Sequence, residues 1–182
     1  MSEANHKINV TRCAALASTA LQNLLAPYHM HIQHIANNEA IPGSFWGDEE
    51  AGLIGDTLLV RPDTPVHSAL HEACHYICMD RRRREGLHTD AGGGYDEENG
   101  VCYLQIILAG HLHGMNQQQM MNDMDAWGYS FRLGSTAEWF KFDAEDAVNW
   151  LRQYDLIDAH NQPTWKLRDQ ESPTHAPDKT EN

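Results

Sequence analysis

The pattern of hydrophobic and polar positions predicts an amphipathic helix from about Pro65 to about Arg84. Thr64 is the expected N-cap and Pro65 the first helical residue, because proline has no N–H to leave unpaired there. Four arginines followed by Gly86 predict the end of this helix, since cations favour the helix C-terminus and glycine tolerates a left-handed cap. The apolar positions at helical spacing are Val66, Leu70, Ala73 and Ile77.

A second helix is predicted from Tyr95 to Ala109, where the chain is apolar nearly all round and is therefore expected to be buried. Three glycines precede it, and its first turn carries Asp96, Glu97 and Glu98. The segment from Gly43 to Val60 predicts a β-hairpin, within which a strand from Gly55 to Arg61 leads into the first helix. The edge strand of this hairpin is expected to be able to pair with an extended substrate.

Shorter elements complete an expected α+β fold, with several helices packed on a small, mostly antiparallel sheet. A single domain is expected over residues 1–161, followed by a disordered tail over 162–182, because that stretch is polar and carries three prolines. The shorter elements are a helix from Val10 to Leu25, a strand from Met30 to Ile35, a helix from Gln117 to Trp127, a short helix capped by Ser135 or Thr136 that runs through Trp139, and a helix capped by Asp143 that runs from Ala144 to about Tyr154.

The amino-acid composition excludes some classes of binding partner. The chain has 182 residues and a formal net charge of -13, which argues against non-specific binding to nucleic acid or to an anionic membrane surface. No stretch has the length of a membrane span, and the first residues lack the apolar core of a signal peptide. A cytoplasmic protein is therefore expected. The four cysteines, Cys13, Cys74, Cys78 and Cys102, resemble small buried thiols more than a disulfide framework.

The pentapeptide His71-Glu72-Ala73-Cys74-His75 has the residue types and spacing of a metal site. Residues four apart lie one above the other on a helix, so His71 and His75 can converge on one cation. Glu72 then points to the flank of that face, where it can reach a water molecule without ligating the ion. The alternative is a helix with two surface histidines, but the apolar flanks, the helix caps and the acidic helix downstream favour the metal site.

A third protein ligand is expected from the helix that begins at Tyr95. Glu98 is preferred to Glu97, because Gln105, the one polar residue in the apolar part of this helix, lies two turns further on nearly the same face. Glu97 stays open as the alternative ligand. Asp80 has a suitable oxygen, but it lies on the same helix as the histidines and closes a tetrahedral site less easily.

These residues resemble a gluzincin metallopeptidase, in which an HExxH helix is followed by a glutamate ligand on the next helix. Here 22 residues separate His75 from Glu98, and the resemblance covers about Phe45 to Ala109. The order of elements is similar to that of the minimal, small intracellular, zincin-like peptidases. The resemblance implies that His71, His75 and Glu98 hold zinc and that Glu72 is the general base for a peptide or protein substrate.

Two other functions stay open at this point. The first is a non-catalytic zincin-like protein that uses the metal structurally or as a sensor for a binding partner. The second is a hydrolase of some other amide. A catalytic site would also need a donor for the developing oxyanion. The residues of suitable type near the motif are His88, Tyr95, Tyr103, His111 and His113.

Overall fold

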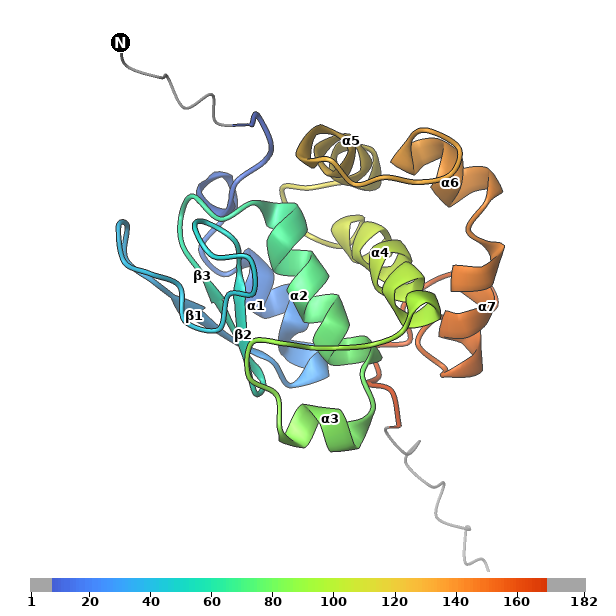
Figure 1. Cartoon of the computed structure of the whole chain (residues 1–182), viewed down its shortest axis with the longest axis horizontal. Coiled ribbons are helices and arrows are strands. Elements are labelled where there is room, and N and C mark those ends of the chain that lie inside the picture. Colours follow the sequence, from blue (N-terminus) through green and yellow to red (C-terminus); the bar gives the residue numbers. More distant parts are fainter. Residues whose placement is uncertain (1–7, 170–182) are drawn as a thin grey trace, which may run out of the picture.

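Helix α2 (Val66–Cys78) lies at the centre of the computed structural model, which describes residues 8–169 (Figure 1). A small sheet lies on one side of α2, and helix α4 (Tyr95–Ala109) packs along the other side. The fold is mixed α+β, with seven α-helices and three strands in these residues. The remaining elements are α1 (Ala20–Leu25), β1 (His31–His34), β2 (Gly52–Ile54), β3 (Thr57–Val60), α3 (Arg81–Glu85), α5 (Gln117–Trp127), α6 (Thr136–Phe142) and α7 (Glu145–Gln153), with 3₁₀ turns at Cys13–Ala15 and Ala26–Tyr28.

The sheet has the order β1-β3-β2 and is mixed, whereas the sequence predicted a mostly antiparallel sheet. β2 and β3 form the expected antiparallel hairpin. β1 pairs with β3 in parallel, because the chain leaves β1 and crosses to the far side of β3 before it forms the hairpin. The strand predicted from Gly55 begins two residues later. Gly55 has a φ of 57°, which places it in the turn of the hairpin.

The helix predicted from Pro65 to Arg84 is divided into α2 and α3. Asp80 lies between them with extended backbone, and its Oδ1 accepts a hydrogen bond of 3.0 Å from Arg83 N. A short acidic side chain that caps the next helix stabilises this break. Thr64 does not cap α2 as predicted, because its hydroxyl oxygen accepts from Arg61 N and so closes the preceding turn. Pro65 is the N-cap.

The predicted helix from Val10 to Leu25 is only partly present. Cys13 N and Ala14 N donate to Thr64 O and Pro62 O, each at 2.8 Å, so the backbone of this stretch pairs with the loop before α2. Regular helix begins at Ala20. Tertiary backbone pairing has therefore replaced the local helical bonds that periodicity predicts.

The second half of the chain follows the prediction more closely. The bounds of α4 and α5 are those predicted, and the side chain of Ser135 caps α6. Asp143 instead forms an ion pair with Arg132, and the N-cap of α7 is Ala144. Helix α7 packs closely on α4, since a Cβ atom on Gly100 would lie 2.7 Å from the ring of Trp150. A side chain at Gly100 would force these two helices apart.

The stretch predicted to be a disordered tail begins at Gln162, and the structure describes it as far as Asp169. Pro163 forms a β-bridge with Ile157, and the ring of Trp165 lies 5.7 Å from that of Tyr28. Arg168 N donates to Ile77 O near the end of α2. These contacts pack residues 163–168 against the core, and residues 170–182 lie outside the described part of the chain.

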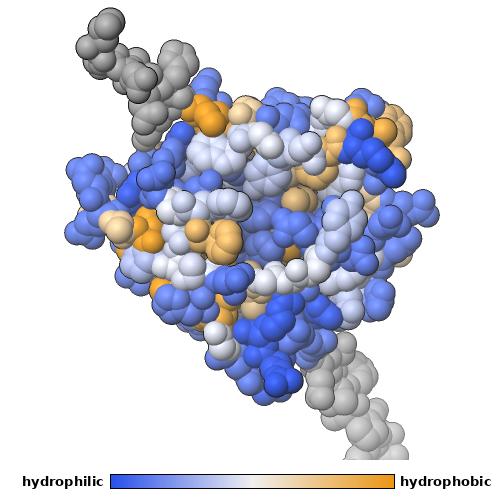
Figure 2. Space-filling view, in the orientation of Figure 1, coloured by the Kyte–Doolittle hydropathy of each residue, from blue (hydrophilic) through white to orange (hydrophobic). Residues whose placement is uncertain are grey.

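None of the helices in residues 8–169 combines the length and the apolar content that crossing a membrane requires. Most of the face seen in Figure 2 is hydrophilic, and hydrophobic residues on it are scattered.

Candidate metal centre

The contact between α2 and α4 brings three potential metal ligands together. His71 and His75 lie one turn apart on α2, and Glu98 lies in the first turn of α4. The three residues form a group here named the ligand triangle, in which each imidazole lies next to a different oxygen of the Glu98 carboxylate. His71 Nε2 lies 3.1 Å from His75 Nε2, while the carboxylate oxygens of Glu98 lie 3.2 Å from His71 Nε2 and 3.3 Å from His75 Nε2. These three residues could bind a metal ion.

The size of this triangle fits a tetrahedral ion. Nitrogen and oxygen ligands lie about 2.0–2.1 Å from zinc, so neighbouring ligand atoms in a tetrahedron are about 3.3 Å apart. Two imidazoles and one carboxylate also leave one position open, as catalytic zinc sites do. The geometry therefore fits the ligand set that the sequence predicted.

Charge in the triangle is set by burial and by the close approach of the two imidazoles. Burial, together with the neighbouring charge of His71, lowers the pKa of His75 to about 4. Burial alone would raise the pKa of Glu98, but hydrogen bonding and the charge of His71 lower it overall. Glu98 is therefore a carboxylate near neutral pH, and His75 is a neutral imidazole with a lone pair to offer.

A buried glutamine orients one of the imidazoles. Gln105 has no exposed surface, and its Oε1 lies 2.8 Å from His71 Nδ1. The amide oxygen can only accept, so Nδ1 carries a proton and Nε2 is the ring nitrogen that can give up its proton and bind a metal ion. In the sequence, Gln105 was visible as the one polar residue in the apolar part of this helix.

Replacing Gln105 with leucine should weaken zinc binding by about 10- to 100-fold, because the ring of His71 would lose the partner that fixes its tautomer and orientation. Competition with a chromophoric chelator measures this affinity. Gln118→Leu, on the exposed surface of α5, is the matched control and should leave it unchanged. An affinity within threefold of the wild type in Gln105→Leu would show that this hydrogen bond does not orient the ligand.

Glu97 points away from the triangle and has a structural role. Its carboxylate accepts from Arg83 Nη1 and Nη2 at 2.8 Å and 2.7 Å and from Arg168 Nη1 at 3.1 Å. Its side chain is 8% exposed, compared with 48% for Glu98. Glu97 thus ties the first turn of α4 to α3 and to the C-terminal segment, which leaves Glu98 as the ligand candidate.

Glu72 lies beside the triangle and is nearly buried, with 7% of its surface exposed. Its pKa is raised to about 7, mainly by burial; the positive charge of His71 opposes this rise, and the negative charges of Glu50 and Glu98 add to it. Glu72 lines two cavities that also contain His71 and Glu98. It therefore faces the same open space as the potential ligands, which is the position expected for a general base.

Three cavities meet at Glu98, so the triangle opens into a branched cleft. The first, here named the loop cavity, is lined by Phe45, Trp46 and residues 89–92 in addition to the site residues. The second, here named the Glu50 cavity, is lined by Trp46, Glu50, Ser68, Trp127, Gly128 and Tyr129 together with His71, Glu72 and Glu98. The third extends towards α6 and α7 and is lined by residues that include Tyr95, Cys102, Tyr129 and Trp139.

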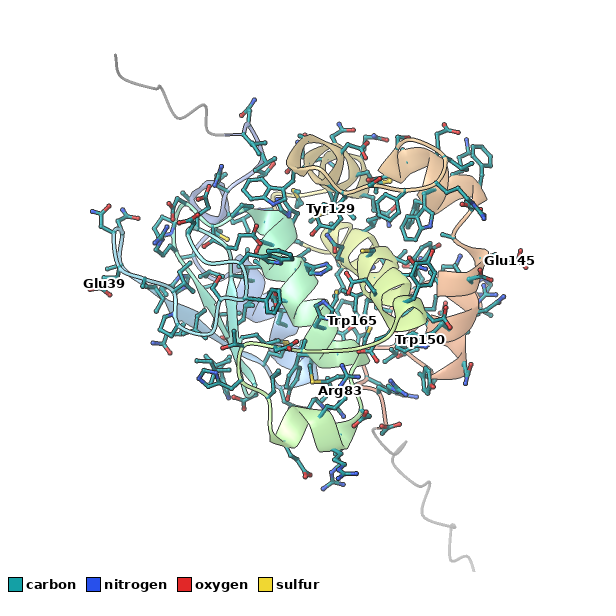
Figure 3. All side chains as sticks on the ribbon, viewed as in Figure 1. Glu39, Arg83, Tyr129, Glu145, Trp150 and Trp165 are labelled. Atoms are coloured by element: carbon teal, nitrogen blue, oxygen red, sulfur yellow. The ribbon has the colours of Figure 1, made fainter. Side chains whose placement is uncertain are left out.

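Tyr129 is a site residue that the sequence did not single out. It follows α5, where Gly128 has a φ of 105° and turns the chain back towards α2 and α4 (Figure 3). Its ring centroid lies 5.9 Å from that of His71. Burial raises the pKa of its hydroxyl to about 12, so the hydroxyl stays protonated near neutral pH. The sequence signal was only an aromatic-rich stretch after a helix end.

The oxyanion donors suggested by the sequence lie mostly elsewhere. Tyr103 stacks on Phe140, and the ring of His111 lies against Trp165. His88 forms a β-bridge with Ile54 at the edge of the sheet. His113 lies with His111 at a separate surface hollow. Of the predicted donors, only Tyr95 lines a cavity that contains a site residue, and its side chain is 81% exposed.

The edge of β2 is already occupied at its central residue, Leu53. Leu53 N donates to Gly43 O at 3.1 Å, and Thr89 N donates to Leu53 O at 3.0 Å. The expectation that the edge strand of the hairpin pairs with substrate is therefore wrong at Leu53. The chain itself covers that edge.

Comparison with models of known protein families, with curated proteins and with solved structures finds no match to this chain. The candidate site is accordingly defined by its geometry: two imidazole nitrogens and one carboxylate group with neighbouring atoms 3.1–3.3 Å apart, a nearly buried carboxyl group beside them, and a branched cleft above.

Proposed function

We propose that this chain is a zinc-dependent metallopeptidase of the gluzincin type, with a zincin-like fold. One observation carries the proposal: His71 Nε2, His75 Nε2 and the carboxylate of Glu98 lie 3.1–3.3 Å apart beside Glu72 in an open cleft. Two imidazoles with one carboxylate form a donor set that suits zinc. A surface pair of histidines would not require the buried glutamine that orients His71.

Each side chain of the site has a separate role in the proposed reaction. Zinc held by His71, His75 and Glu98 would polarise a peptide carbonyl and lower the pKa of water. Glu72 takes one proton from the attacking water and returns it to the nitrogen of the leaving amine, so that one C–N bond breaks and one C–O bond forms. Tyr129, protonated and within the cleft, donates a hydrogen bond to the developing oxyanion.

A structural metal site is the second candidate, and Cys102 is the observation in its favour. The sulfur of Cys102 lies 3.9 Å from Glu98 Oε1, so it is a possible fourth protein donor for a closed site. Replacing Cys102 with serine distinguishes the two functions. A closed site should lose most of its metal affinity, whereas an open site should keep it within a fewfold.

The acidic chain is expected to act on a peptide or protein and to bind neither nucleic acid nor a membrane surface. We place this reaction in the cytoplasm, because the described cysteines are free and three of them are buried.

The first experiment measures metal in the purified protein. We expect one zinc per chain in the wild type and less than one tenth of that in His71→Ala, because removing one of three protein ligands opens the site. Elemental analysis by mass spectrometry gives the stoichiometry, and a peptide-library assay before and after chelation tests hydrolysis. His29→Ala, on the exposed turn after α1, is the control. Unchanged metal content in His71→Ala would refute the ligand assignment.

A further inference from the structure

The Glu50 cavity contains a carboxylate that forms no ion pair within residues 8–169. Glu50 is half-buried, and its carboxylate accepts from Trp127 Nε1 at 3.1 Å and from the hydroxyl of Ser68 at 3.5 Å. Both donors are neutral. Among the ion pairs within residues 8–169, none involves Glu50, whereas the adjacent Glu49 pairs with Arg12 at 2.8 Å.

The donors of Glu50 hold the carboxylate in place within the cavity. Trp127 is itself fixed, since its ring lies 4.8 Å from the buried ring of His67 on one side and 5.7 Å from the guanidinium of Arg12. Ser68 is 3% exposed, and its oxygen also accepts from Ala51 N. The orientation of the Glu50 carboxylate is therefore set before any ligand arrives.

The walls of the cavity suit an alkyl chain that ends in a positive charge. Trp46 is 71% exposed at the mouth and offers an apolar face to methylene groups. Three other ionisable side chains line the cavity: Glu72 and Glu98 are acidic, and His71 is basic. The cavity has a volume of about 320 Å³, which lies within the range of sites that hold small organic groups.

We propose that the Glu50 cavity is the specificity pocket of the site and takes a lysine or arginine side chain of the substrate next to the bond that is cleaved. The proposal rests on the proposed peptidase function, because the cavity shares His71, Glu72 and Glu98 with the metal centre. The cationic group supplies the ion pair that Glu50 does not form within residues 8–169. A hard divalent cation fits less well, since it requires six to eight oxygen ligands and Glu50 is the one carboxylate held by Trp127 and Ser68.

Binding tests the pocket without any need for hydrolysis. The probes are acetyl-Gly-Lys-Gly-amide and its norleucine analogue, titrated into zinc-loaded Glu72→Gln protein. The indole N–H resonance of Trp127, assigned with Trp127→Phe, reports occupancy by NMR because that N–H contacts Glu50. We expect the lysine peptide to bind at least about 10-fold more tightly, the lower end of what a charge-assisted hydrogen bond contributes.

Two variants on neighbouring positions complete the test. Glu50→Gln should lose the preference for lysine while its affinity for the norleucine peptide stays within threefold, and Glu49→Gln should keep the preference. Equal affinities of the two peptides for the parent protein would overturn the pocket proposal, as would displacement of the lysine peptide by millimolar Mg²⁺ or Ca²⁺ in preference to amines.

The same comparison separates this proposal from the peptidase proposal. In a cleavage assay, kcat/KM should favour lysine over norleucine by at least about 10-fold in the wild type and by less than threefold in Glu50→Gln. If the lysine peptide binds selectively but no peptide in a diverse library is cleaved, the pocket stands and the peptidase function fails. If peptides are cleaved without any preference for a cationic side chain, the peptidase function stands and the pocket proposal fails.

Discussion

Glu72→Gln is expected to lower kcat/KM for peptide hydrolysis by about 10² to 10⁴-fold, the usual contribution of a general acid–base group. Glutamine keeps the size of the side chain but cannot take a proton from the attacking water. The zinc content should stay at one per chain, because Glu72 lies beside the ligand triangle and is not part of it. Steady-state kinetics with a cleaved library peptide, together with elemental analysis of the same preparation, measures both quantities.

The matched control for this variant is Glu138→Gln on α6, away from the cleft, which should leave both quantities unchanged. A Glu72→Gln protein that keeps more than one tenth of the activity would refute the assigned role of Glu72. A protein that loses its zinc would instead place Glu72 among the ligands. In a structural metal site, the substitution should have no effect on function at all.

Glu98→Ala should lose zinc affinity and Glu97→Ala should lose stability, although the two residues are adjacent. Glu98→Ala should lower zinc affinity by more than 100-fold, because one of three protein ligands is lost, with a small effect on the stability of the metal-free protein. Glu97→Ala should keep zinc but destabilise the fold by about 3 kcal/mol, since it leaves the guanidinium groups of Arg83 and Arg168 without their shared carboxylate. Chelator competition and urea unfolding measure the two effects.

The contrast between these two variants is itself the control for unfolding. If Glu97→Ala loses zinc while Glu98→Ala keeps it, the third ligand is Glu97 and the described orientation of this turn is incorrect. A stability loss of about 3 kcal/mol corresponds to a decrease in Tm of about 6–12 °C for a chain of this size. Thermal unfolding of the metal-free proteins therefore separates the two variants clearly.

The sequence predicted which candidate side chains lie together better than it predicted the elements around them. Helix α4 begins and ends where its apolar pattern does, so the register that placed Glu98 and Gln105 on one face was reliable. The ligand choice followed from that register alone. Glu97 was a close alternative because its arginine partners come from α3 and from the C-terminal segment, and periodicity within one helix carries no information on either.

Elements set by tertiary contacts were predicted less well. The backbone from Cys13 pairs with the loop before α2, and helical periodicity cannot reveal such pairing. The break at Asp80 depends on one capping side chain within a run of residues that are good helix formers. Tyr129 reaches the cleft only because Gly128 ends α5 with a left-handed turn. The hydrophobic periodicity of the neighbouring residues could not predict that Tyr129 lies in the cleft.

The contact between Arg168 and Glu97 couples two distant parts of the chain. Arg168 bonds the residue next to Glu98, and it also donates to Cys78 O at the end of the helix that carries both histidines. If His71, His75 and Glu98 bind a metal ion as we propose, docking of this segment should favour metal binding, and by linkage metal binding should favour docking to the same extent. On that proposal, a protein or peptide that captured residues 163–168 should lower the metal affinity without entering the cleft.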